Sequence, residues 1–305
     1  MISADGSHRK NIQQRCNKGI GTINEIMSIL QSSYFGKYYF ETAIILRESL
    51  FLSSLLLNSE AWVGYTEKDV RELEKCDEML LARILGCDKN TSNTLKYLEL
   101  GVVPVRFVLM KRKLSFLQYV LKQEKTSMIY QVLMATLKDP KRNDFVVTCK
   151  KYLKKLKIDL EFEEIENMSK SKFKKLLKEK TNKEAFLYLK EQKENQKKIQ
   201  NIEYKSFKMQ DYFKERKSEV SKTIFAARGK NLDIKMQKPW KYQDKLCVGC
   251  KLREETGDEL LQCEGFGEKE TFPYEFFFSQ SVENQRIIGE NVLKRLRQRK
   301  KMMDV

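Results

Sequence analysis

Histidine is almost absent from this sequence. Of its 305 residues only one is histidine, His8, close to the N-terminus. Imidazole-based acid–base catalysis or a Ser-His-Asp triad would have to use this residue. An ordinary surface position is the simpler interpretation of His8.

The motifs of common enzyme classes are missing as well. The chain contains no phosphate-binding loop, no H-E-x-x-H and no G-x-S-x-G. Polymerases and many nucleases hold two metal ions with clustered carboxylates. Here no two aspartates are adjacent, and Glu163-Glu164 lies in an acidic helical stretch without an obvious partner. We therefore expect a protein that does not carry out chemistry on its ligand.

Residues that favour turns are scarce. The chain has 4 prolines and 13 glycines, and 33% of its residues are charged against 41% that are hydrophobic. All-β proteins have more turn residues and disordered chains have less hydrophobic content. The composition therefore favours a helix-rich globular protein.

No apolar run is long enough to predict a membrane span. The most apolar stretch, Phe40–Leu57, is interrupted by Glu41, Arg47 and Glu48, which indicates a buried helix. We recognise no signal peptide, and the 7 cysteines are scattered along the chain. A reducing compartment, the nucleus or the cytoplasm, is the expected location.

Hydrophobic periodicity predicts helices throughout, so the expected fold class is all-α. Apolar residues recur every three or four positions from Ile12 to Leu30. This helix should pack against the helix at 40–57, because both are too apolar to stand alone. Thr66 and Asp69 form a capping-box-like start to a helix that ends at Gly86. One short helix is expected to end at Gly101, and the next to run from Pro104 to Lys122. A further helix is expected to start at Ser169. The remaining predicted helices cover 145–157, Lys183–Lys198 and Met209–Arg228.

Positive charge is concentrated in the middle of the chain. Residues 101–245 contain 37 Lys and Arg against 18 Asp and Glu, whereas residues 1–100 contain 12 against 13 and residues 246–305 contain 10 against 11. A solvated helix surface usually has mixed signs, so a sustained excess of one sign indicates a polyanionic partner such as nucleic acid. The alternative is that these lysines only decorate exposed helices.

The helix predicted over 145–157 carries its lysines on the side opposite an apolar edge. Such a face can run along a phosphate backbone without reading bases. The nucleic-acid contacts expected along the chain are Lys111, Arg112, Lys113, Lys141, Arg142, Lys150, Lys151, Lys154, Lys155, Lys157, Lys294, Arg295 and Arg297.

The strongest local motif is Cys247-Val-Gly-Cys250, followed by Cys263. Two thiolates spaced C-x₂-C around a tight turn can bind one Zn²⁺, and a later pair of ligands completes the tetrahedron. Here Glu259 and Cys263 form the later pair, and Glu259 stands where a knuckle would have histidine. The pattern predicts a zinc site with Glu259 or water as the fourth ligand. The alternative is a group of buried thiols.

A series of further short motifs follows along nearly the whole chain. They are Ile2–Ser7, Arg47–Trp62, Leu73–Gly86, Tyr97–Gly101, Pro104–Arg106, Lys111–Leu117, Pro140–Phe145, the C-x₂-C-x₈-E-x₃-C stretch from Cys247, and Phe276–Ser279 with Gln285. Each is weak alone. Their collinear order resembles the C-terminal part of a non-LTR (LINE-type) retrotransposon reverse transcriptase polyprotein, downstream of the polymerase palm.

The resemblance implies a domain order and a role. It implies a thumb-like helical bundle (1–100), a basic helical nucleic-acid-binding region (101–229), a linker (230–245), a degenerate cysteine knuckle (246–270) and a C-terminal helix with a basic tail (271–305). It places the catalytic aspartates upstream of residue 1. The chain would then be a remnant that holds RNA or a primer–template duplex and has no polymerase activity of its own.

A different class of function stays open. The chain could be a helical scaffold that binds an acidic protein partner, with the knuckle structural or empty. Counterion release gives nucleic-acid binding a steep dependence on salt, which would separate the two. No membrane or small-molecule partner is expected.

Overall fold

The computed structural model describes residues 9–31, 36, 38–88, 90–140, 144–214, 218–239, 241–266, 277–278 and 281–304. Within these ranges the regular elements are helices without a sheet, and an isolated antiparallel bridge joins Leu246 and Glu254. The predicted all-α fold class is confirmed. None of the helices in these ranges combines the length and apolar character that a membrane span requires.

The chain folds as two compact units that interleave along the sequence. Unit 1 comprises residues 1–28, 45–80 and 102–191, and unit 2 comprises residues 29–44, 81–101 and 192–305. The sequence predicted consecutive regions instead, and only its boundary at residue 100 lies close to a boundary between units. The other unit boundaries fall inside helices α1, α2, α4 and α10 or next to them.

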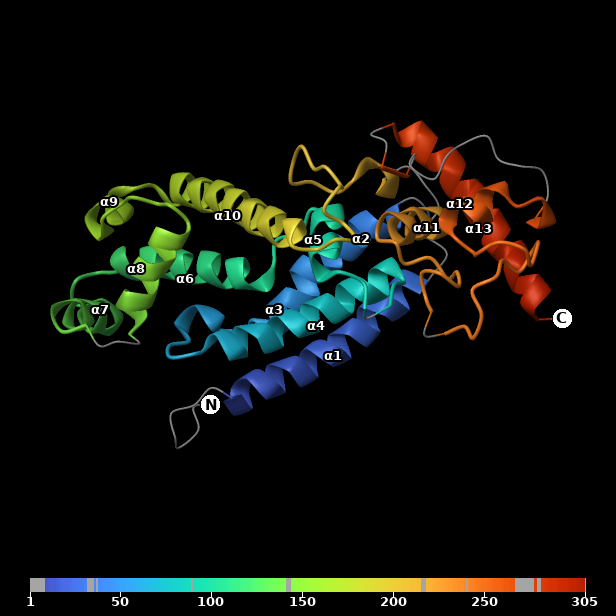
Figure 1. The fold of residues 1–305 in the computed structure, drawn as a ribbon. Helices are drawn as coiled ribbons and strands as arrows, with labels where there is room; N and C mark the ends of the chain where they lie inside the picture. Colours follow the sequence, from blue (N-terminus) through green and yellow to red (C-terminus); the bar gives the residue numbers. More distant parts are fainter. Residues whose placement is uncertain are drawn as a thin grey trace. The chain divides into compact units, whose positions relative to one another are not determined.

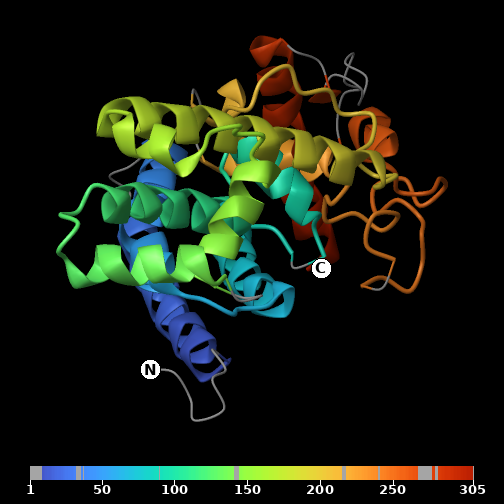
Figure 2. The same ribbon diagram turned by 90° about the vertical axis from the view of Figure 1, so that its left-hand side faces the viewer.

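Unit 1 is built from helices that pack around α6. Its elements are α1 (Arg9–Gln31), a π-helical segment (Arg47–Phe51), α3 (Leu52–Leu55), a 3₁₀ turn (Ser59–Ala61), α4 (Glu67–Leu85), α6 (Val105–Leu121), α7 (Met128–Lys138), α8 (Phe145–Lys155), α9 (Phe162–Asn167) and α10 (Lys170–Glu194). Figures 1 and 2 show α7, α8 and α9, in green and yellow-green, gathered beside α6 and α10.

The N-terminal helix packs as expected. A Cβ built on Gly19 of α1 would lie 3.2 Å from Leu55 Cδ1 and 3.3 Å from Phe51 Cε2. These contacts confirm that α1 packs against the apolar helix around residues 47–55. Close approach at this point depends on the small Gly19.

Helix caps follow the sequence signals. Thr66 N donates to Asp69 Oδ2 at 2.8 Å, and Asp69 N donates to Thr66 Oγ1 at 3.3 Å. This reciprocal pair is the predicted capping box at the start of α4. Gly86, at the end of α4, has a φ of +61°, which glycine adopts without strain.

A buried ion pair fixes the centre of unit 1. Arg47 Nε and Nη2 donate to the two carboxylate oxygens of Asp77 at 2.7 and 2.6 Å, and Nη2 also donates to Val103 O at 2.9 Å. Arg47 belongs to the π-helical segment and is 1% exposed. Planar bidentate pairing satisfies a buried guanidinium with little geometric freedom.

Unit 2 has a second buried charge at its centre. Its elements are α2 (Tyr39–Leu46), α5 (Asn93–Leu100), a 3₁₀ turn (Asp211–Phe213), α11 (Ser218–Arg228), α12 (Gly257–Gln262), a further 3₁₀ turn (Glu264–Phe266) and α13 (Val282–Met303). Glu99 of α5 is fully buried and accepts hydrogen bonds from Tyr204 Oη at 2.5 Å, Tyr212 Oη at 2.8 Å and Arg228 Nε at 2.8 Å. One carboxylate thus joins three separate stretches of chain.

Two predictions about the C-terminal half were wrong. The helix expected over Met209–Arg228 does not include Asp211–Phe213, which form a 3₁₀ turn in which the Tyr212 hydroxyl reaches Glu99, and α11 covers Ser218–Arg228. The segment 230–245 is not a free linker, since Leu232 and Ile234 are buried within unit 2.

Candidate metal centre and basic surface

The cysteine motif forms a tight turn closed by backbone hydrogen bonds. Cys247 N donates to Arg253 O at 2.7 Å, and Lys251 N donates to Cys247 O at 2.8 Å. The bridge between Leu246 and Glu254 closes the base of this turn. Cys247 and Cys250 are therefore held on one short loop, as the C-x₂-C spacing predicted.

The second pair of ligands lies on and just after α12. Thr256 caps this helix by accepting a hydrogen bond from Glu259 N at 3.0 Å. Cys263 N donates to Glu259 O at 2.8 Å, so Cys263 lies one helical turn beyond Glu259 and on the same side. The x₃ spacing in the sequence is the cause of this placement.

Two glycines let the halves of the cluster approach each other. A Cβ on Gly265 would lie 2.5 Å from the carbonyl carbon of Gly249, and a Cβ on Gly249 would lie 3.0 Å from Cys263 Sγ. Any side chain at Gly265 would therefore collide with the backbone of the C-x₂-C turn.

The candidate ligand atoms lie close together, and two of their separations are near those of a tetrahedral site. The Sγ and carboxylate atoms of Cys247, Cys250, Glu259 and Cys263 all lie within 4.8 Å of one another. Cys247 Sγ and Cys263 Sγ are 3.6 Å apart, and Cys250 Sγ lies 3.3 Å from Glu259 Oε1. Tetrahedral Zn²⁺ with ordinary bond lengths separates two sulfurs by about 3.8 Å and a sulfur from an oxygen by about 3.5 Å. The residues present fit zinc.

The three thiols differ in their electrostatic surroundings. Burial raises the pKa of Cys247 and raises the pKa of Cys263 to about 12. Backbone N–H groups of Leu252 and Arg253 point at the sulfur of Cys250 and lower its pKa. Without a cation the two buried sulfurs are therefore held as neutral thiols, and a bound metal would stabilise their thiolates.

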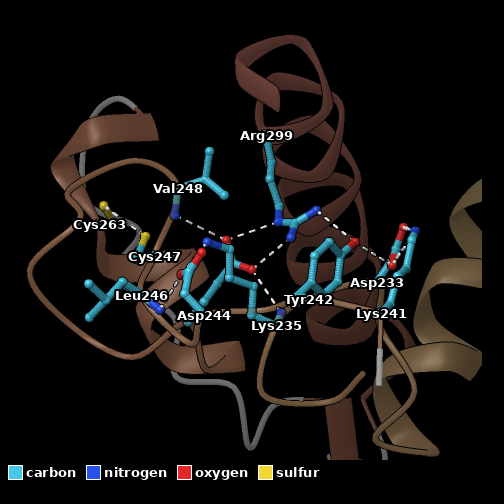
Figure 3. Close-up of polar contacts among 11 residues, drawn as sticks. Asp233, Lys235, Lys241, Tyr242, Asp244, Leu246, Cys247, Val248, Cys263 and Arg299 are labelled. Atoms are coloured by element: carbon cyan, nitrogen blue, oxygen red, sulfur yellow. Dashed lines mark hydrogen bonds and ion pairs between the residues drawn. The ribbon is translucent and has the colours of Figure 1, made fainter. Parts of the chain in front are cut away.

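A buried carboxylate, that of Glu255, accepts a hydrogen bond from the C-x₂-C turn and anchors it. Glu255 is fully buried, and its oxygens accept from Lys235 N at 2.8 Å, Val248 N at 3.3 Å and Arg299 Nε at 2.9 Å. The second contact of Arg299, from Nη2 to Glu255 Oε2 at 2.9 Å, is an ion pair without hydrogen-bond geometry. Figure 3 shows Arg299 directed from its helix toward this network, with Tyr242 beside its guanidinium and the sulfurs of Cys247 and Cys263 close together.

Arg295, one turn earlier on α13, supports the other half of the cluster. Its Nη1 donates to Leu260 O at 2.9 Å and to Cys263 O at 3.0 Å, and the residue is 2% exposed. The prediction that Arg295 contacts nucleic acid was wrong, because its guanidinium is used inside the protein. On the same helix Lys294 is exposed, and the exposed Arg297 pairs with Glu219.

The predicted basic run on α6 divides between interior and surface. Lys113 is fully buried and its ammonium group donates to Trp62 O, so its prediction as a nucleic-acid contact was wrong. Arg112 is half-buried and donates to Leu56 O at 2.7 Å and Leu52 O at 3.2 Å. Lys111 alone of the three borders a surface groove.

The predicted lysine contacts between residues 150 and 157 are all exposed, but one of them does not lie on α8. Lys150, Lys151, Lys154 and Lys155 are exposed, and among them Lys155 has a carboxylate, that of Glu67, at 3.8 Å. Lys157 lies beyond the end of the helix with a φ of +52°, and its Nζ is 3.0 Å from Glu184. It is therefore not part of the α8 face. Lys141 and Arg142 lie outside the described residues.

A groove between α6 and α10 carries positive charge that the sequence analysis missed. It has a volume of about 280 Å³ and is lined by Lys111, Ser115, Gln118, Tyr119, Lys122, Gln123, Lys170, Phe173 and Lys174. Gln118 Nε2 donates to Ile165 O at 3.1 Å and to Met168 O at 3.0 Å, which fixes the start of α10 against α6. We refer to it as the α6–α10 groove. The many lysines after Ser169 were the signal in the sequence that could have indicated this surface. The sequence did not show that α6 is the helix facing these lysines.

Burial lowers the pKa of Lys111. Of the nearby charges the carboxylate of Glu48 has the largest effect and opposes this lowering, whereas Lys178 and Lys174 add to it. Lys122, Lys170, Lys174 and Lys178 are exposed. Among the described residues that line this groove there is no carboxylate. The groove is therefore a place where like charges repel one another.

Comparison with known proteins gives no relative to guide the assignment. No protein-family model, curated protein or solved structure matches the chain. The function is therefore inferred from the residues and their geometry.

Proposed function

We propose that this chain binds nucleic acid through the α6–α10 groove and the exposed lysines of α8. The observation that carries the proposal is the group of lysines around an apolar groove whose described lining residues include no carboxylate. Crowded positive charges raise the free energy of the folded protein, and a phosphate backbone relieves that repulsion. A solvated helix face would mix the two signs.

Lysine contacts of this kind bind the backbone and read no sequence. Lysine presents a compact charge on a flexible stem, and contacts to phosphate set position and affinity but carry no base information. We therefore expect affinity that varies little with sequence and falls steeply with salt. The nucleus or the cytoplasm is the compartment in which this chain would meet RNA or DNA.

The cysteine cluster is proposed to bind Zn²⁺ through Cys247, Cys250, Cys263 and Glu259. The interatomic spacing and the two apposed glycines support it. Four protein ligands leave no open position, so the metal would have a structural role and would hold the turn against α12. The resemblance to the thumb and C-terminal region of a LINE-type reverse transcriptase accords with this pairing of basic helices and a knuckle, and catalysis would lie outside this chain.

Binding to RNA and DNA across a salt series tests the first proposal. The test variant replaces Lys122, Lys170 and Lys174 by Gln. The control replaces three exposed lysines of the same unit that do not line the groove and are distant in sequence from the residues that do, Lys18, Lys138 and Lys183. Both variants lose the same charge, so a difference between them reports position.

We expect the log–log salt slope of the test variant to shrink by about 2 to 3 units, at about 0.7 to 0.9 units per phosphate contact. The control should keep the wild-type slope. Equal slopes for both variants would reject the groove as the binding surface. Wild-type protein that binds an acidic polypeptide but neither RNA nor DNA would favour the scaffold function instead.

Metal analysis tests the second proposal. Protein purified with zinc present should contain one zinc per chain, and Cys250→Ser should lower that content, while Cys87→Ser, a half-buried cysteine outside the cluster, should not. Normal folding with a zinc content near zero would make the cluster a group of buried thiols.

A further inference from the structure

We propose that the α6–α10 groove takes a single-stranded segment of nucleic acid, with one unpaired base stacked on Tyr119. This inference rests on the proposed function and names the form of nucleic acid that the groove accepts. Its elements all belong to unit 1.

Tyr119 is an exposed aromatic ring in an ordered setting. Its side chain is 55% exposed, although it lies within α6. Its ring stacks on Phe116 with centroids 5.9 Å apart and planes at 18°, and Phe116 meets Phe145 of α8 edge-on at 5.8 Å. Phe116 thus supports the ring of Tyr119 by stacking, which reduces the side-chain entropy lost when a base stacks on it.

Positive charge surrounds this ring from both helices. Lys111 lies on α6 and Lys122 directly follows its last residue, about 16 Å away along the helix axis at 1.5 Å per residue. Lys170 and Lys174 lie opposite, on the first turns of α10, with the buried ring of Phe173 between them. Aromatic rings interleaved with cations along a groove are the arrangement that binds single strands, because bases stack while phosphates meet the charges.

The size of the groove favours a single strand over a duplex. Its volume of about 280 Å³ is close to the lower limit of small-molecule pockets, so it admits a group of nucleotide size. Bases within a duplex are stacked on each other and have no free face for Tyr119. A base that is already unpaired avoids the cost of unstacking.

The polar groups of the groove predict weak sequence preference. Gln118 donates to two carbonyls, Gln123 Nε2 donates to Tyr119 O at 2.9 Å, and Ser115 Oγ donates to Lys111 O at 2.8 Å. Each of these side chains already bonds to its own chain. Stacking accepts any base because every base has an aromatic face.

The test combines a change in the protein with a change in the strand. The probes are a deoxythymidine oligomer and an abasic oligomer of the same length, which has the phosphates without the bases. The protein variants are Tyr119→Ala, Tyr119→Phe and, as a matched control, Tyr38→Ala, whose side chain is also 55% exposed. Circular dichroism checks that all three fold.

Tyr119→Ala should weaken binding to the deoxythymidine oligomer by about 5-fold or more, as expected for the loss of one base–aromatic stack. Binding to the abasic oligomer should not change, and the salt slope should stay at the wild-type value because no charge is removed. Tyr119→Phe should retain wild-type affinity. Tyr38→Ala should behave as wild type on both probes.

Equal loss on both oligomers, or no difference between Tyr119→Ala and Tyr38→Ala, would overturn the stacking site while leaving nucleic-acid binding intact. Wild-type protein that binds neither oligomer nor duplex would overturn both proposals. Binding confined to duplex, with Tyr119→Ala unaffected, would reject the single-strand assignment alone.

Discussion

Replacing Glu255 by Gln should destabilise the metal-binding part of unit 2. The carboxylate is fully buried and receives two backbone N–H groups, those of Lys235 and Val248, together with the guanidinium of Arg299. Gln has nearly the same shape. It removes the negative charge opposite Arg299, and its NH₂ group must face a donor on one side of the network.

The magnitude follows from the burial of both partners. Arg299 is 3% exposed, so water cannot replace the lost carboxylate. Breaking a buried ion pair by removing one partner costs about 3 to 5 kcal/mol. Because Val248 belongs to the C-x₂-C turn, we also expect a loss of zinc affinity of about 10- to 100-fold, the usual effect of removing an outer-shell partner.

Urea unfolding followed by circular dichroism, and competition for zinc with a chelator, measure the two effects. The matched control is Glu254→Gln, which changes the adjacent carboxylate on an exposed side chain. That change should stay within about 0.5 kcal/mol of wild type. If Glu255→Gln unfolds at the same urea concentration as the control and keeps its zinc affinity, then the carboxylate does not organise the turn.

Three further predictions concern other parts of the chain. Burial lowers the pKa of Lys113 to about 8, below its value of about 10.5 in the unfolded chain. The cost of burying the charged ammonium group therefore lowers the unfolding free energy fully below pH 8, and this cost disappears as the pH rises to about 10.5. Lys113→Met should therefore stabilise the protein by about 1 to 2 kcal/mol at pH 7, since loss of the hydrogen bond to Trp62 O offsets part of the gain. The advantage in unfolding free energy should shrink between pH 8 and 10.5, and a constant difference would contradict it. Glu259→His should tighten zinc binding in chelator competition, because neutral imidazole suits zinc beside thiolates; unchanged affinity would mean that residue 259 is not a ligand. Gly101→Ala should lower the unfolding free energy by about 2 kcal/mol or more, because φ is +62° and the new Cβ would lie 2.3 Å from the carbonyl carbon of Lys208; a neutral effect in urea unfolding would refute the close approach.

Local signals in the sequence predicted local structure well. The capping pair Thr66 and Asp69, the glycine after α4 and the glycine after α5 act through neighbours within a few residues, and the structure has all of them. The C-x₂-C turn and the x₃ spacing of Glu259 and Cys263 are local for the same reason. The knuckle pattern also predicted that the two pairs of residues come together, and in the structure the sulfurs of Cys247 and Cys263, 16 positions apart, are separated by 3.6 Å.

Contacts between residues far apart in the sequence explain why some predictions were wrong. A lysine pattern does not reveal that Lys113 meets Trp62 O, 51 residues away, or that Arg295 meets the carbonyl of Cys263. Both residues resemble surface charges in the sequence. The amphipathic pattern of a helix shows which of its faces is apolar, but it does not show which other segment of the chain packs against each face. The start of α11 was misplaced in the same way, since the bond from Tyr212 to Glu99 spans 113 residues.

The interleaving of the two units sets an order of assembly during synthesis. Every segment of unit 1 has left the ribosome once residue 191 has emerged, whereas residues 29–44 and 81–101 must wait for segments beyond residue 192. Until then Glu99 lacks Arg228, and Phe40 lacks Phe213, whose ring centroid later lies 4.4 Å away. We therefore expect a nascent chain of this length to expose the Glu99 carboxylate without Arg228 and the Phe40 ring without Phe213. Exposed apolar surface of this kind promotes aggregation or chaperone binding. We therefore expect a translation stall shortly after residue 191 to be more damaging than one near the C-terminus.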